Sequence, residues 1–270
     1  MLRVGSEYNT ELQRLVVRIK KDVQALLLPV IEQEAVNYLA DSEEGSRFYF
    51  RDGWADRVQA VLDRLNLMYS MPWFSILANQ VASKFVRASV DFVDKQHKRN
   101  FGIDVYNDSP KMQDYLRAAT IQNVKLIESI PKHYMENVMN TVYQGMRNGV
   151  MPRNIAMELN QKFGVESRHA KFIARDQAAK INGEISKRRQ EAAGFEYFLW
   201  LDADDSRVRH RHRVIANADV GYGNGVYRWD DLPKSSAGET IQPGSDYQCR
   251  CIARPQRTSV IEKYIASKKN

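Results

Sequence analysis

Proline and glycine recur along this chain of 270 residues at spacings that mark the starts and ends of helices. Proline suits the first turn of a helix, where its missing N–H leaves no hydrogen bond unmade, and serine caps that turn. Glycine adopts the left-handed backbone that ends many helices. Three pairs of such signals predict consecutive helices at residues 131–149, 152–164 and 167–194. The chain is therefore constrained to a mainly helical fold.

Apolar side chains at helical spacing predict further helices in the first 110 residues. Thr10–Gln13 has the form of a capping box, and the helix that follows it is expected to end or kink near Pro29. Apolar stripes over residues 58–68 and 74–92 predict two more helices that face a shared core. Ser109–Pro110 predicts the start of another helix, with serine as the cap and proline in the first turn.

The character of the sequence changes after Gly194. The aromatic run at residues 195–200 is typical of a strand, and residues 225–229 and 248–253 predict two further strands among loops rich in glycine, asparagine and aspartate. The glycines at 221, 223 and 225 lack the lysine and following helix of a phosphate-binding loop, so they are expected only to turn the chain. The predicted fold class is mainly α, with a small α+β C-terminal module that contains a few short strands after residue 194.

These elements group into three predicted regions. Residues 1–108 form a helical N-terminal region. Residues 109–258 form the main domain, with helices over 109–193 and a mixed strand and loop module over 194–258. Residues 259–270 are a basic tail, which is expected to fray.

Composition restricts the class of protein. With 43% hydrophobic and 27% charged residues, the chain is expected to fold rather than stay disordered. No apolar run approaches the roughly 18 residues of a membrane helix, and no signal-peptide segment opens the chain, so we expect a protein made in the cytoplasm without a membrane segment. Its two cysteines form no disulfide framework and are expected to remain thiols or to bind metal.

The net charge of +7 favours a polyanionic neighbour such as nucleic acid. The helix predicted from residue 167 carries enough basic side chains for a face against the DNA backbone, and a solvated basic face is the alternative. The candidate DNA contacts are Arg168, Lys171, Arg175, Lys187, Arg188 and Arg189.

The residues best suited to chemistry lie in the C-terminal module. His210 and His212 stand two residues apart, as do Cys249 and Cys251, and such pairs share one face of an extended chain. His212, Cys249 and Cys251 are therefore the candidate ligands of a tetrahedral zinc ion that joins two segments. No cofactor is required by the sequence, and zinc is the one that these residues allow.

Other interpretations of the same residues stay open. Cys249 and Cys251 can be small buried apolar residues on an inner strand, with His212 hydrogen-bonded to Asp205 or to backbone. A Cys–His nucleophile is a third interpretation, but no known nucleophile signature surrounds it. The acids at 202, 204 and 205 are expected to pair with nearby arginines. The remaining histidines, His97, His133 and His169, are interpreted as surface or satisfied core residues without ligand neighbours.

From about residue 123 to 255 the order of motifs resembles the phage Mu F-like minor head proteins. The most specific part is Asp205–Arg209 with His212, followed by Pro243–Gly244 and by Cys249–Arg250–Cys251 with Pro255. Weaker matches are Asn123–Ile127, Ile130–Pro131, Ala174–Gln177, Gly194 and Trp200. The residues of the motif are Trp200, Asp205, Arg207, Arg209, His212, Cys249, Arg250 and Cys251. The chain departs from the family at Ala216–Ala218, where a glycine is frequent, and at Gln248, where asparagine is common.

The resemblance implies a structural, non-enzymatic protein of the tailed-phage head. Such a protein is built in the host cytoplasm and resides in the virion, at the portal vertex or capsid interior. Its implied partners are the portal protein, the major capsid or scaffolding protein, and packaged double-stranded DNA. The helical N-terminal region, residues 1–108, is then expected to dock on portal or capsid protein. The alternative is a zinc-dependent enzyme acting on nucleic acid, with Asp205 as a proton-transfer group.

Overall fold

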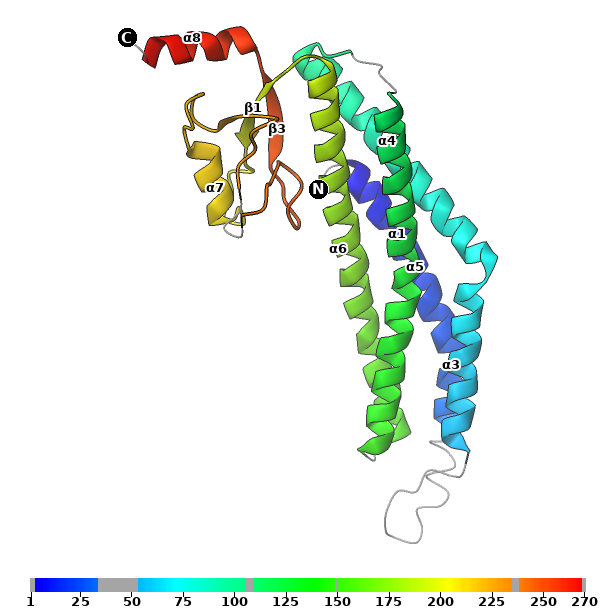
Figure 1. The fold of residues 1–270 in the computed structure, drawn as a ribbon. Helices are drawn as coiled ribbons and strands as arrows, with labels where there is room; N and C mark the ends of the chain where they lie inside the picture. The colour runs from blue at the N-terminus through cyan, green and yellow to red at the C-terminus, as the bar shows by residue number, and fades with distance from the viewer. Residues whose placement is uncertain (1–2, 34–52, 105–108, 149, 235–237, 269–270) are drawn as a thin grey trace. The chain divides into compact units, whose positions relative to one another are not determined.

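A computed structural model describes residues 3–33, 53–104, 109–148, 150–234 and 238–268. Its elements are α1 (Arg3–Leu26), α3 (Trp54–Ser70), α4 (Pro72–Phe101), α5 (Pro110–Arg147), α6 (Pro152–Ala192), β1 (Tyr197–Leu201), α7 (His210–Asn217), β2 (Val226–Arg228), β3 (Ile252–Gln256) and α8 (Thr258–Lys268), as Figure 1 shows. Long helices dominate the chain, and the short strands all follow residue 194. The predicted fold class is confirmed.

Several helix ends match the local signals in the sequence. Helix α1 ends at Leu26, close to the break expected near Pro29, although it begins at Arg3 and not at the predicted capping box. Helix α5 begins at Pro110, and the N–H of Met112 donates to the Ser109 hydroxyl at 3.3 Å, as a serine cap requires. The capping-box prediction was wrong because the apolar face of α1 already includes Val4 and Tyr8, which are buried.

Two predicted helix breaks are wrong. Pro131 lies inside α5, where its neighbours Ile130 and Tyr134 are buried. Helix α6 runs without interruption through Gly164 and Ser167. The Ser167 hydroxyl does not cap a helix but donates to the Gln13 side chain at 2.6 Å, and Gln13 donates back to the Ser167 carbonyl at 2.9 Å. Packing against other helices therefore overrides the local breaking signals.

The predicted end of α6 at Gly194 is confirmed by its backbone geometry. Gly194 has a φ of 80°, in the left-handed region that glycine adopts without strain. The N–H of Gly194 donates to the Glu191 carbonyl and the N–H of Phe195 to the Gln190 carbonyl, both at 3.0 Å. This pair of bonds is the Schellman pattern, which satisfies the last carbonyl groups of the helix and directs the chain into β1.

The chain divides into two compact units that do not follow the predicted boundary after residue 108. Unit 1 comprises Met1–Ser6, Ser83–Thr120 and Arg175–Asn270, and unit 2 comprises Glu7–Ala82 and Ile121–Ala174. Helices α4, α5 and α6 contribute residues to both units. In the part of the chain that the structure describes, no helix combines the length and the apolarity needed to span a membrane.

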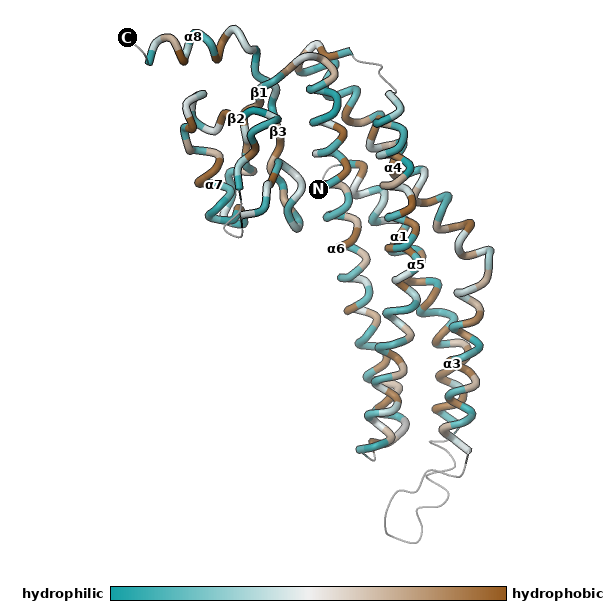
Figure 2. The backbone as a smooth tube through the Cα atoms, in the orientation of Figure 1, coloured by the Kyte–Doolittle hydropathy of each residue, from teal (hydrophilic) through white to brown (hydrophobic). Residues whose placement is uncertain are grey.

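Unit 2 is built from helices, and its core is apolar. Leu12, Leu62 and Ile127 are fully buried, and apolar residues recur along the helices with polar ones between them (Figure 2). A buried hydrogen bond from the Tyr8 hydroxyl to the Asn123 side chain, at 3.1 Å, links α1 to α5. Residues of both predicted apolar stripes are buried, among them Leu62 and Phe74, but the second stripe, residues 74–92, continues from unit 2 into unit 1.

Unit 1 contains the sheet, whose strand order is β2-β1-β3 with both pairings antiparallel. Phe198 of β1 lies opposite Tyr227 of β2 and Pro255 of β3. The first two predicted strands coincide with β1 and β2 within a few residues. The third was placed too early, because Gln248 has a φ of 49° that no strand residue adopts, and β3 begins only after Cys251.

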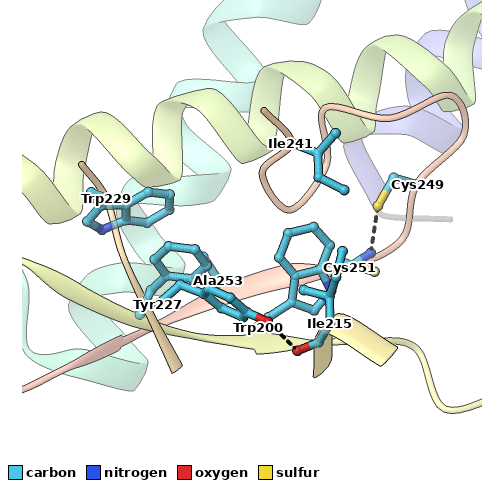
Figure 3. Close-up of a cluster of buried hydrophobic side chains, with 9 residues drawn as sticks. Trp200, Ile215, Tyr227, Trp229, Ile241, Cys249, Cys251 and Ala253 are labelled. Atoms are coloured by element: carbon cyan, nitrogen blue, oxygen red, sulfur yellow. Dashed lines mark hydrogen bonds between the residues drawn. The ribbon is translucent and has the colours of Figure 1, made fainter. Parts of the chain in front are cut away.

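The two faces of the sheet carry different clusters. Phe198 and Trp200 belong to a buried cluster with both cysteines (Figure 3), while Tyr197 belongs to a smaller one with Ile261 of α8. The prediction of a frayed basic tail is wrong, since residues 259–268 lie in α8. Tyr264 and Lys268 of this helix both bind the Asp219 carboxylate, which anchors it to the loop before β2.

Candidate metal centre

Helix α7 brings only one of the two predicted histidines to the site. The helix begins at His210, so residues two apart point in different directions, unlike those of an extended chain. His212 is 2% exposed, and His210 is exposed. The predicted pairing of the two histidines on one face is therefore wrong, while the selection of His212 as the candidate ligand agrees with its placement.

His212, Cys249 and Cys251 bring three donor atoms together, all within 4.8 Å of one another. The distance from His212 Nδ1 is 3.7 Å to Cys249 Sγ and 3.4 Å to Cys251 Sγ. The Cys251 N–H lies 3.4 Å from Cys249 Sγ (Figure 3), and the Trp200 ring meets the His212 ring edge-on at 5.7 Å. The two segments predicted to meet are thus in contact, and the cysteines lie just before β3 instead of on a strand.

The second nitrogen of His212 is held by Asp246, a residue that the sequence analysis missed. His212 Nε2 lies 2.9 Å from Asp246 Oδ2, and the same carboxylate forms ion pairs with Arg209 and Arg211. The sequence had suggested Asp205 or backbone as the partner of His212. Asp246 carries no local signal for this role, because it lies in a loop 34 positions from the histidine.

The two thiols differ in their affinity for protons. Hydrogen bonding by Cys251 lowers the pKa of Cys249, while burial opposes this shift and the hydrogen bond with His212 reinforces it. The pKa of Cys251 is raised by its hydrogen bond to Cys249 and by burial. The pKa of His212 is also raised, chiefly by its hydrogen bond with Cys249. Cys249 is therefore the thiol that loses its proton more readily, and the thiolate is the form in which cysteine binds metals.

Asp205 and Arg250 form a second link between the same segments. The guanidinium of Arg250 contacts both carboxylate oxygens of Asp205, and this pairing holds the pKa of Asp205 well below its usual range. Arg207 also contacts Asp205, as expected for a local ion pair. The Arg209 guanidinium donates to the Tyr247 carbonyl at 2.6 Å. Arg209 therefore binds the loop that carries the cysteines, and Arg250, between the two cysteines, binds Asp205.

The loop that ends at Cys251 rests directly on helix α6. A Cβ atom added at Gly183 would lie 2.5 Å from the Pro243 carbonyl oxygen, and one added at Gly244 would lie 2.6 Å from the Ala179 oxygen. Gly244 also has a φ of 90°. Backbone meets backbone at this point, so the Pro243–Gly244 part of the motif has a packing role that only glycine satisfies.

Asp176 of α6 holds the turn before Cys249. Its carboxylate accepts the Gln248 N–H at 2.9 Å. Gln248 stands in the left-handed region with a φ of 49°, where asparagine is tolerated better than glutamine. Asparagine, which the resemblance implies at this position, would adopt the turn with less strain.

A second group of potential metal ligands lies in unit 2. His133 of α5 and His169 of α6 flank Glu166, which is fully buried, and the three offer ligand atoms within 4.8 Å of one another. His133 Nδ1 is 2.7 Å from Glu166 Oε2. The interpretation of these histidines as lacking ligand neighbours was therefore wrong. The spacing of Glu166 and His169, three residues apart on a helix, was the local signal that could have revealed part of the group.

The predicted DNA-contacting residues do not share one environment. Arg189 is 3% exposed and forms a two-bond ion pair with Asp94, so its prediction as a DNA contact is wrong. Arg188 pairs with Glu184, and Lys187 lies near Glu191. Of the remaining candidates, Arg168 and Lys171 are exposed and Arg175 is half-buried.

Comparison with known proteins finds similarity to one family over the segment that contains most of this site. Residues 136–254 match the family described as Phage Mu protein F like protein. This segment is Mu F-like. It contains α6, the sheet strands β1 and β2, α7 and both cysteines, and the resemblance inferred from the motifs is confirmed over it.

One relative extends the similarity beyond the Mu F-like segment. A protein of Haemophilus influenzae, described as an uncharacterized protein, is 27% identical to this chain over 251 residues. The aligned region is 92% of this chain and 52% of the relative, so the chain spans about half the length of the curated relative that it matches. No solved structure matches the chain.

Proposed function

We propose that this chain is a structural minor head protein of a tailed bacteriophage. It binds the portal or the interior of the capsid, aids procapsid assembly, and resides in the virion after assembly in the host cytoplasm. The Mu F-like segment supports this proposal, and the proposed partners are portal, capsid or scaffolding protein. No catalytic residue is assigned.

One observation carries the structural role: the motif residues contact one another. Arg250 binds Asp205, Arg209 binds the Tyr247 carbonyl, and His212 faces both cysteines. These contacts hold the loop at residues 243–251 in place. A module fixed in this way is a rigid unit suited to assembly with other proteins.

The alternative, a zinc-dependent enzyme acting on nucleic acid, needs a proton-transfer group beside the metal ligands. Asp205 was the candidate for that role. Its carboxylate is paired with Arg250 and Arg207, and its lowered pKa keeps it ionised and unable to act as an acid near neutral pH. The geometry therefore favours the structural role.

The test uses the full chain in its own phage or prophage. The variant Gly183→Ala forces the Pro243 loop off α6, whereas Gly164→Ala on the same helix meets only the end of the flexible Arg168 side chain, at 3.5 Å. We expect the first variant to lower the yield of infectious particles and to weaken co-purification with portal protein, and the second to leave both unchanged. Normal infectivity and assembly from a phage that lacks the protein would contradict the proposal.

Contact with packaged DNA is a separate part of the proposal. It rests on Arg168 and Lys171, which are exposed on α6, and on the net charge of +7. The double variant Arg168→Gln, Lys171→Gln should reduce the affinity for double-stranded DNA and make the salt dependence less steep. An unchanged binding curve across salt concentrations would exclude these two residues as contacts.

A further inference from the structure

We propose that His212, Cys249 and Cys251 bind one zinc ion, which fastens α7 to the loop before β3. This inference concerns the stability of the module and stands independently of the proposed role in the phage head. Two lines of geometry carry it: the spacing of the three donor atoms, and the way in which the histidine is held.

The donor atoms are spaced as they are around a tetrahedral zinc ion. Bond lengths of about 2.3 Å from zinc to sulfur and about 2.0–2.1 Å from zinc to nitrogen, at a tetrahedral angle, place nitrogen and sulfur about 3.6 Å apart. The distances from His212 Nδ1 to the sulfurs of Cys249 and Cys251 are 3.7 and 3.4 Å. The three residues can therefore bind zinc without a rearrangement of the backbone.

Asp246 prepares His212 for this role. With Nε2–H donating to the carboxylate at 2.9 Å, the lone pair of Nδ1 points toward the two sulfurs. Histidine ligands of zinc commonly donate their second N–H to a carboxylate, which fixes the tautomer and the orientation of the ring. Arg209 and Arg211 form ion pairs with Asp246 in turn, which restrain the carboxylate that orients His212.

Zinc also satisfies the site better than hydrogen bonds alone. Nδ1 takes part in one hydrogen bond at a time, yet two buried sulfurs lie within 3.7 Å of it. A zinc ion receives an electron pair from all three atoms. Two sulfur donors and one nitrogen select zinc over magnesium or calcium, which prefer oxygen.

The burial of the three ligands favours a structural zinc site over a catalytic one. His212, Cys249 and Cys251 are 2%, 3% and 6% exposed. Among the described His, Cys, Asp and Glu residues, no fourth joins the group, so we assign three protein ligands. The ion then links residues 37 and 39 positions apart, and structural zinc of this kind contributes directly to folding.

The first experiment measures metal in the full chain, purified without a metal-affinity tag. We expect about one zinc ion per chain by elemental analysis. Cys249→Ser and Cys251→Ser should each remove most of it, while His210→Ala, an exposed neighbour of the ligand on α7, should keep it. A His169→Ala variant removes any contribution of the second group in unit 2. Zinc content that is absent from the wild-type chain, or unchanged in the cysteine variants, would overturn the proposal.

A second measurement uses only the wild-type chain, so that a misfolded variant does not decide the result. With zinc bound, the two thiols should resist alkylation until a chelator is added, and the chelator should lower Tm by about 5 °C or more. Replacement by cobalt should give a sulfur-to-cobalt charge-transfer band. Alkylation and Tm that do not respond to the chelator, together with no such band, would contradict a metal at these thiols.

Discussion

The two halves of helix α6 have different neighbours, although they belong to one continuous helix. Residues 152–174 lie in unit 2, where Ile155, Leu159 and Ile173 are buried among helices. Residues 175–192 lie in unit 1. Here Asp176 and Gly183 contact the loop before Cys249, and Gln190 donates to the Ala253 carbonyl of β3. The first half packs through apolar residues at helical spacing, whereas the second half makes its contacts through specific small or polar residues.

Because the two halves of α6 make different kinds of contact, similar substitutions should change stability and local structure differently in each half. In a helical core a smaller side chain leaves a cavity, and the damage stays proportional to the lost volume. In the C-terminal module the chain is held by individual contacts between segments distant in sequence, so a single change can release a loop. The predictions that follow test this contrast.

The largest expected effect comes from Trp200→Ala, compared with Leu159→Ala. Trp200 is 1% exposed and Leu159 is 3% exposed, so we expect losses of about 3–5 and 2–5 kcal/mol in the free energy of unfolding. Only the first should raise the alkylation rate of the two cysteines in native buffer. Equal thiol reactivity in both variants would remove the contrast between the regions.

The pH dependence of stability should depend on His97, which lies against the second half of α6. His97 Nε2 is 2.8 Å from the Ser186 hydroxyl, and burial lowers the pKa of His97 to about 4, with Asp94 opposing and Arg189 reinforcing the shift. The unfolded chain binds the proton more readily, so stability is present above about pH 6.5 and is lost as pH falls toward 4. We expect a loss of about 2–3 kcal/mol over this range.

The control is His97→Asn, which keeps a polar side chain but does not titrate in this range. Its unfolding free energy, measured by denaturant titration at several pH values, should change less between pH 7 and pH 4 than that of the wild type. If the two proteins show the same slope, the buried imidazole is not the source of the acid sensitivity.

Glycine at two positions of α6 gives a matched comparison of the halves. Gly164→Ala should stabilise the chain by about 0.5–1 kcal/mol through helix propensity. Gly183→Ala should destabilise it by about 2 kcal/mol, since the new methyl group meets the Pro243 backbone at 2.5 Å. Opposite signs in denaturant unfolding are the expected result, and stabilisation by both variants would show that the loop does not rest on the helix.

The smallest predicted effect concerns the left-handed turn before Cys249. Gln248→Asn should stabilise the chain by about 0.5 kcal/mol, because asparagine tolerates the positive φ of 49° better than glutamine. The same exchange at Gln161, exposed on α6, should be neutral or slightly destabilising, since asparagine has the lower helix propensity. A loss of stability in Gln248→Asn would indicate a contact of the longer side chain.

Local signals in the sequence predicted the features that depend on neighbouring residues. The apolar stripe of α3, the Ser109 cap and the Gly194 helix end are set within a few positions along the chain, and all are present. The signals at Pro131 and Ser167 failed because burial and the Gln13 contact keep both residues within helices.

The candidate site was predictable in part for the same reason. His212 and the cysteines were identified from residue type and spacing alone. Asp246 was missed because His212 lies 34 positions away. His133 lies 33 positions from Glu166, but the spacing of Glu166 and His169 on one helix was a local signal that was overlooked. The close approach of Gly183 to Pro243 was equally hidden, since only the folded backbone reveals that two segments touch.

Specific contacts fix the loop at residues 243–251 on α6. Amide hydrogen exchange at Gln248 tests this attachment most directly, because this N–H donates to Asp176 across 72 positions of sequence. We expect a strongly protected amide in the wild-type chain. In Asp176→Ala the amide should exchange at least about tenfold faster, because one hydrogen bond is lost. A Gln248 amide that exchanges in the wild type as fast as in an unfolded peptide would contradict this attachment.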